Sequence, residues 1–157
     1  MNKGMSEIVK TISKIVVPFI IIFGISVIFY GHLTPGGGFP GGVIISASFV
    51  LLLLAYGREK VLSKLSLYKS DILHDIGAIM FLSVSLIGFA GGVFFLNIFN
   101  KGKLFSLWSG GNLLFSNIAI GLKVGTSLFL GITLLSMARI IHKENKIEFY
   151  EKEEDIK

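Results

Sequence analysis

One lysine lies deep in an apolar stretch of the sequence. Lys123 is the only Lys, Arg, Asp or Glu well inside a segment apolar enough to cross a membrane. A charge at the bilayer centre costs about 2.5–3.5 kcal/mol on insertion scales, which makes this lysine a functional candidate. If the helix starts near Ile118, Lys123 lies about 7 Å from its outer end, within snorkelling reach. The sequence is compatible with snorkelling, a structural ion pair or a place in an ion path.

The other ionisable candidates lie at the ends of apolar segments. His32 follows the first segment, where a solvated terminal histidine is a simpler interpretation than an ion-path residue. Asp71, His74 and Asp75 form an i, i+3, i+4 cluster before the third segment. Helix capping and dipole compensation explain the acids, and proton entry is the alternative. His74 and His142 alone, without a further signature, do not support haem ligation.

The glycine-rich segment between the first two apolar stretches is the most unusual motif. It contains Pro35, Gly36, Gly37, Gly38, Phe39, Gly41 and Gly42. The pattern fits G-x-G-x-x-G, but the strand and the later acid of a dinucleotide site are missing, so that function is rejected. We expect a loop that packs tightly against a partner subunit, with an ion-lining role as the alternative.

The elements that position these residues are four apolar segments. Hydrophobic residues make up 52% of the chain and charged residues 16%, against about a quarter charged in soluble domains. We therefore expect an all-α membrane protein with a single membrane domain over residues 1–157. Ser70 or Asp71 is expected to cap the third helix. The expected helices are 12–30, 41–56, 76–97 and 118–141, with a polar tail at 142–157.

Basic residues gather on one side of the expected membrane. The N-terminal segment, the loop between the second and third helices and the C-terminal end contain 12 Lys and Arg residues, whereas the opposite side has Lys101 and Lys103. The positive-inside rule then predicts that both termini are cytoplasmic, in a multi-pass protein of the cell membrane. The net charge of +5 forms no basic stripe with interleaved aromatics, so nucleic-acid binding is not indicated.

Small residues recur at helix-packing spacing. Gly88 with Gly92, and Gly121 with Gly125, form G-x-x-x-G pairs that let membrane helices approach closely. Four helices offer more such stripes than they need, which indicates partner subunits. The chain has no cysteine, which excludes thiolate metal sites, iron–sulfur clusters and cysteine nucleophiles within it. We expect no catalytic residue, metal or cofactor.

Two stretches carry a family resemblance. Residues 30–44, YGHLTPGGGFPGGVI, and residues 117–125, NIAIGLKVG, resemble the MrpB (MnhB) family, which is a component of the Mrp-type multi-subunit sodium/proton antiporter. Similar subunits occur in energy-converting membrane-bound hydrogenases and related archaeal respiratory complexes. The resemblance implies a four-helix subunit without chemistry of its own, beside other small subunits and large complex I-like antiporter subunits.

The resulting functional hypothesis is an accessory subunit of a cation/proton exchange module. The alternative is a subunit of a redox-driven membrane complex, such as a hydrogenase or sulfur reductase. A third, weaker hypothesis is an independent small channel or transporter, which predicts that the purified chain is active alone.

Overall fold

The fold of the chain is described by a computed structural model over residues 5–98, 103 and 105–154, with side chains described up to residue 138. The described elements are helical, and four helices are long and apolar enough to cross a membrane. This confirms the prediction of an all-α membrane protein with four spans. The elements are α1 (Glu7–Phe29), α2 (Gly38–Tyr56), α3 (Arg58–Leu62), α4 (Leu67–Ile87), the 3-10 turns η1 (Gly88–Gly91) and η2 (Leu107–Gly110), and α5 (Asn112–Glu154).

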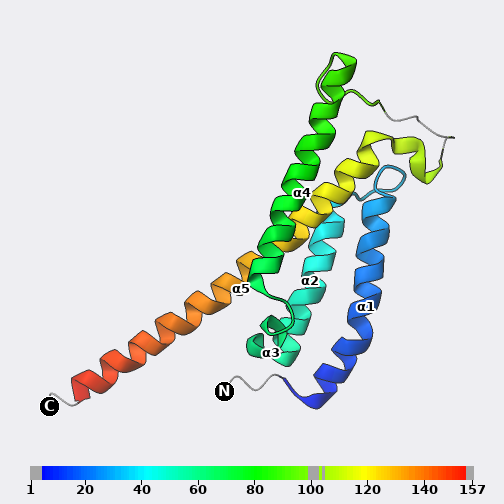
Figure 1. The fold of residues 1–157 in the computed structure, drawn as a ribbon. Helices are drawn as coiled ribbons and strands as arrows, with labels where there is room; N and C mark the ends of the chain where they lie inside the picture. The colour runs from blue at the N-terminus through cyan, green and yellow to red at the C-terminus, as the bar shows by residue number, and fades with distance from the viewer. Residues whose placement is uncertain (1–4, 99–102, 104, 155–157) are drawn as a thin grey trace.

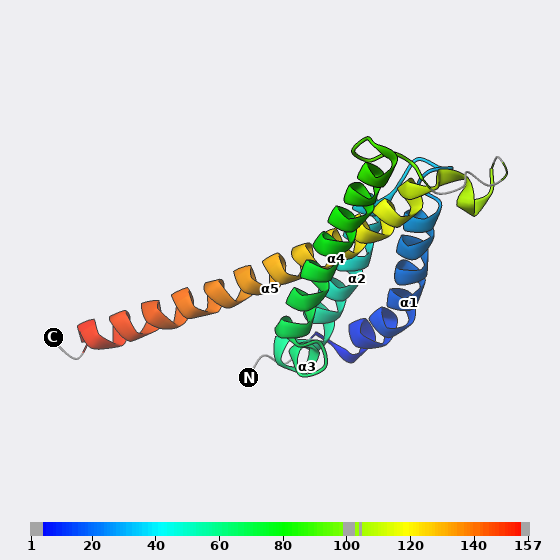
Figure 2. The ribbon, with the colours of Figure 1, turned by 45° about the horizontal axis from the view of Figure 1, so that its top comes forward.

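The four long helices pack in the spatial order α1, α2, α5, α4 (Figure 1). The start of α1 and the short helix α3 lie at one end of the bundle, and η1 and η2 lie at the other. The C-terminal half of α5 leaves the bundle and projects away on the α3 side, as both Figure 1 and Figure 2 show. The candidate span within α5 is Asn112–Ala138.

Glycine lies at each of the three main helix crossings. A Cβ on Gly24 of α1 would lie 3.1 Å from the Gly41 carbonyl oxygen of α2. A Cβ on Gly42 would lie 2.7 Å from the Gly121 carbonyl oxygen of α5. A Cβ on Gly77 of α4 would lie 2.9 Å from the Lys123 nitrogen. Close packing of small residues replaces the hydrophobic effect as the force that holds membrane helices together.

The third expected helix, 76–97, is displaced in the structure. It begins at Leu67, after Ser66 in an extended conformation, so Ser70 and Asp71 lie inside the helix and do not cap it. It ends at Ile87, because η1 leads into Gly92, whose φ of 92° is left-handed. The residues after Gly92 fold back along α4, and the Phe95 N–H donates to the Ser85 carbonyl at 3.2 Å.

The other helix limits also differ from the sequence-based expectation. The first helix begins at Glu7 and the second at Gly38, earlier than residues 12 and 41. The last helix begins at Asn112 rather than near residue 118, and it continues through the expected polar tail to Glu154. The earlier start of α5 places Lys123 deeper in the span.

Candidate functional site

The glycine-rich motif is divided between a loop and a helix. Gly36 and Gly37 end the loop, whereas Gly38 opens α2, so Phe39, Gly41 and Gly42 are helical rather than part of a loop. Gly37 has a φ of 123°, which residues with a Cβ rarely adopt. The motif therefore makes a turn and begins a helix within a few residues.

An asparagine of α5 satisfies the start of α2. The Gly38 N–H donates to Asn117 Oδ1 at 3.3 Å, although the two residues are 79 positions apart. The first N–H groups of a helix have no partner within the helix, so a side-chain acceptor there stabilises the start. A Cβ on Gly38 would collide with the Asn117 carbonyl oxygen and would lie 2.8 Å from Ile120 Cβ. Gly38 and Asn117 therefore fix the contact between α2 and α5.

A second asparagine pair anchors the start of α5. Asn97 Oδ1 accepts the Asn112 N–H at 3.1 Å, and Asn112 Nδ2 donates to the Leu96 carbonyl at 2.8 Å. This exchange ties the segment after η1 to α5. It also corrects the expected packing pair of Gly88 and Gly92, because α4 has already ended there. Gly88 contacts the returning chain at Leu96, and a Cβ on Gly92 would meet no atom within 4 Å.

His32 lies in a packed position between the first loop and η2. Its ring is partly buried, and its Nε2 is 3.3 Å from the Ser106 carbonyl oxygen. A Cβ on Gly110 would lie 2.8 Å from the imidazole Cγ, so the ring packs directly against this glycine. His32 Nδ1 is buried without a hydrogen-bond partner among the described atoms. The interpretation as a solvated terminal histidine is therefore wrong for this residue.

His74 joins α4 to α5. Its Nδ1 lies 2.7 Å from Ser127 Oγ, and the side chain is partly buried. The neighbouring acids, Asp71 and Asp75, are exposed. Only the histidine of the predicted cluster therefore faces the helix contact. Within the described residues, no group of three or more His, Asp or Glu side chains is placed to hold a metal ion.

Lys123 lies one turn along the same contact between α4 and α5. Its backbone packs on Gly77, and its side chain is exposed. At a rise of 1.5 Å per residue it lies about 16 Å from the start of α5 at Asn112, near the middle of the candidate span. The depth of about 7 Å expected from the sequence is thus too small, because the helix begins sooner than expected. Among the described side chains, the ion pair present is Lys10–Glu7, so Lys123 has no carboxylate partner there.

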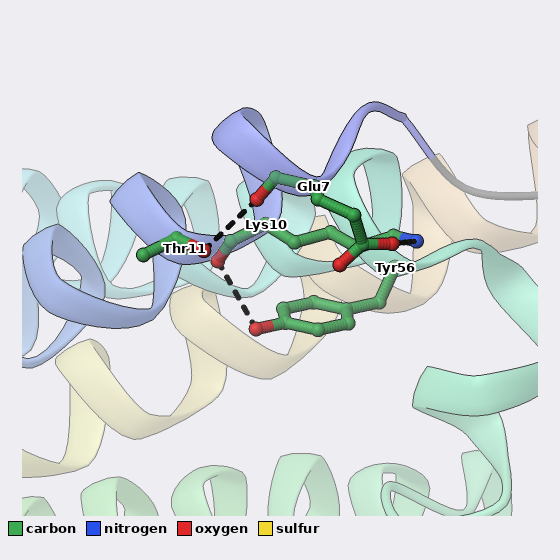
Figure 3. A network of polar contacts seen from close by, with 4 residues as sticks. All are labelled: Glu7, Lys10, Thr11 and Tyr56. Carbon is green, nitrogen blue, oxygen red and sulfur yellow. Dashed lines mark hydrogen bonds and ion pairs between the residues drawn. The ribbon is translucent and has the colours of Figure 1, made fainter.

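A polar network closes the opposite end of α1 onto α2 (Figure 3). Lys10 Nζ lies 2.8 Å from Glu7 Oε1, and Thr11 Oγ1 donates to the Glu7 carbonyl at 2.9 Å. The Tyr56 hydroxyl, from the last residue of α2, donates to the Lys10 carbonyl at 3.1 Å. The Met5 N–H also donates to the Ala55 carbonyl at 3.0 Å. These bonds hold the start of α1 beside the end of α2.

Sequence reasoning missed three of these contact residues. Asn117, Ser127 and Asn97 are ordinary polar residues whose partners are distant in sequence. The available signal was a polar side chain inside or beside an apolar segment, because such a side chain needs a hydrogen-bond partner when buried.

The fold and the site define a helical multi-pass membrane protein, with glycine-based helix packing and a lysine at mid-span. The chain belongs to the family described as "Domain related to MnhB subunit of Na+/H+ antiporter", whose family model matches residues 8–130. That match includes α1 to α4 and α5 as far as residue 130.

Curated relatives carry the same family name over a shorter stretch. The chain is 42% identical over 78 residues to the "Putative antiporter subunit mnhB2" of Staphylococcus aureus strain Newman, and equally to that of strain USA300. The aligned stretch covers 50% of this chain and spans about half of the relative, 55% of its length.

A solved structure shares the fold. The chain is similar to a chain in the "Structure of the membrane-bound sulfane sulfur reductase (MBS), an archaeal respiratory membrane complex", with a TM-score of 0.71 and 32% sequence identity. The match covers 84% of this chain and 58% of that chain.

Proposed function

We propose that this chain is an accessory membrane subunit of a multi-subunit sodium/proton antiporter module and has no catalytic site of its own. The observation that carries the proposal is the family match over residues 8–130, which includes most of the four spans. The curated relatives are named antiporter subunits, which supports the same assignment. The partners are then other antiporter-module subunits, both small and complex I-like.

A redox-driven complex is the second candidate assembly. It is favoured by the structural similarity to a chain of the sulfane sulfur reductase complex, which is described as a respiratory membrane complex. In such an assembly this chain keeps the same role within the exchange module, and reductase or hydrogenase subunits become further partners.

Lys123 is the residue we assign to contact with a partner. Its side chain is exposed near the middle of the span and has no carboxylate partner among the described side chains. An ammonium at this depth is stabilised by an opposite charge or by a wet cavity. A carboxylate on a membrane helix of a neighbouring subunit supplies the charge, and a hydrated ion path between subunits supplies the water.

We place the protein in the cell membrane with both termini in the cytoplasm. The basic residues of the loop around α3 support this orientation through the positive-inside rule. The start of α1 and α3 lie at the same end of the bundle, as an even number of crossings requires (Figure 1).

Native purification of the tagged full-length chain tests the assignment. We expect antiporter-module subunits to co-purify, and sodium-dependent proton exchange to be present in vesicles containing the complex but absent with this chain alone. Additional metal-bearing reductase or hydrogenase subunits would identify the redox-driven assembly. Isolation of the chain without partners, together with exchange by the chain alone, would contradict the accessory role in favour of an independent transporter.

A further inference from the structure

A basic pocket opens at the α3 end of the bundle, apart from the contact between α4 and α5. Its volume is about 440 Å³, and its polar walls are Lys14 of α1, Tyr56 of α2, Lys60 of α3 and Lys64 just beyond α3. The three lysine side chains are exposed. Segments distant in the chain thus converge on one concave site with three ammonium groups.

The nearby acids do not neutralise this pocket. Glu7 forms its ion pair with Lys10, at 2.8 Å, and it also interacts electrostatically with Lys60. Glu59 is exposed on α3 and does not line the pocket. Three lysines against one shared carboxylate leave the pocket with a net positive charge. An anion is therefore the ligand that this site attracts.

The inner walls of the pocket are apolar. Leu52, Val61 and Leu65 line it below the lysines, and Val61 is buried. The Tyr56 ring forms another wall, and Lys60 Nζ lies 5.3 Å from the centre of that ring. The Tyr56 hydroxyl already donates to the Lys10 carbonyl, so the ring is held in place (Figure 3). The site therefore combines a cationic rim with an apolar floor.

The pocket lies at the depth where lipid headgroups are found. α2 ends at Tyr56 and α4 begins at Leu67, so the lining residues from Tyr56 to Leu65 connect two membrane spans. Lys14 comes from within α1, about 10 Å from the start of that helix, and its long side chain reaches the same pocket. Basic pockets between membrane helices at the cytoplasmic side are a recognised setting for anionic lipid headgroups.

We propose that this pocket binds the phosphate of an anionic phospholipid, with Lys14, Lys60 and Lys64 donating hydrogen bonds to its oxygens. The apolar floor of Leu52, Val61 and Leu65 receives the adjoining glycerol and first methylene groups. The amphipathic lining distinguishes a lipid from free phosphate, which has no apolar part. This site does not depend on the proposed transport function, since it concerns the lipid around the chain.

Lysine footprinting on the full-length chain tests the proposal directly. The chain is reconstituted in vesicles of phosphatidylcholine alone, or of equimolar phosphatidylcholine and phosphatidylglycerol, and acetylated briefly. We expect phosphatidylglycerol to lower the acetylation of Lys14, Lys60 and Lys64 relative to Lys69, which is exposed at the same end but does not line the pocket. Equal protection of the three lysines in both lipids would overturn the proposal, as coverage by another protein segment would give. Protection by inorganic phosphate in phosphatidylcholine vesicles, with no added effect of phosphatidylglycerol, would also overturn it.

Substitution supplies the second measurement. Native mass spectrometry of the chain released from the mixed vesicles reports how many phosphatidylglycerol molecules stay bound. Each of Lys14→Gln, Lys60→Gln and Lys64→Gln is expected to weaken retention about fivefold, and Lys69→Gln to leave it unchanged. Wild-type retention in the triple variant would refute the site. Helix content by circular dichroism verifies the fold of each variant, and the footprint on the unmodified chain decides the matter if a variant does not fold.

Discussion

His74 Nδ1 and Ser127 Oγ lie 2.7 Å apart and join α4 to α5 one turn from the place where Gly77 packs on the backbone of Lys123. The hydrogen bond and the glycine contact fix the register of the two antiparallel helices. This register keeps the Lys123 side chain on the outside of the bundle, where a neighbouring subunit can reach it. The polar contact thus controls how the mid-span charge is presented.

The His74–Ser127 bond should show a measurable coupling energy. We expect His74→Phe and Ser127→Ala each to destabilise the bundle, and the double variant to lose less than the sum of the two. Interhelical hydrogen bonds in membranes average about 0.6 kcal/mol and reach about 1.7 kcal/mol, so the coupling should fall in that range. A double-mutant cycle on unfolding in detergent measures it. Strict additivity would show that the two side chains do not stabilise each other.

Gly38→Val should disrupt the contact between α2 and α5. The added side chain collides with the Asn117 carbonyl oxygen, and overpacking of this kind costs about 1–3 kcal/mol. Gly131→Val is the matched control, because a Cβ on Gly131 would meet no atom within 4 Å. We expect the first variant, and not the second, to lower the yield of assembled complex on native gels. Equal yields would reduce Gly38 to an ordinary helix-start residue.

The four spans were predictable because each is a long apolar segment, and length with hydropathy is enough to identify a membrane helix. The helix ends were less predictable. The start of α2 depends on Asn117 and the start of α5 on Asn97, partners that local sequence patterns do not reveal. Gly92 stops the third span early through its left-handed conformation, although its spacing from Gly88 matches a packing stripe.

The candidate site shows the same division between local and distant information. Lys123 was identifiable because a charge in an apolar stretch is visible in the sequence. Its depth was not, because that depth depends on where α5 begins. The burial of His32 depends on its contact with Gly110 near the start of α5, which no helical period encodes.

The topology is tested by single cysteines, which the sequence permits because it contains no native cysteine. Ser63 follows α3, Lys103 lies in the loop before η2, and both are exposed. We expect Lys103→Cys to react with an impermeant thiol reagent in intact cells, and Ser63→Cys to react only after the membrane is opened. Reaction of Ser63→Cys in intact cells would contradict a cytoplasmic α3 and the orientation inferred from the basic residues.

The role of Lys123 is decided by two substitutions at its position near the middle of the span. Lys123→Met keeps an unbranched apolar stem and removes the ammonium, whereas Lys123→Arg keeps a charge that does not deprotonate. If Lys123 pairs with a carboxylate of a partner, the methionine variant leaves that carboxylate unpaired at a cost of about 3–5 kcal/mol, and assembly is lost. Arginine then restores assembly. If Lys123 lines a hydrated ion path, the methionine variant assembles but loses sodium-dependent proton exchange in inverted vesicles. We expect one of these two losses, because the depth of Lys123 makes snorkelling costly. A methionine variant that assembles fully and exchanges at the wild-type rate would remove Lys123 from both roles.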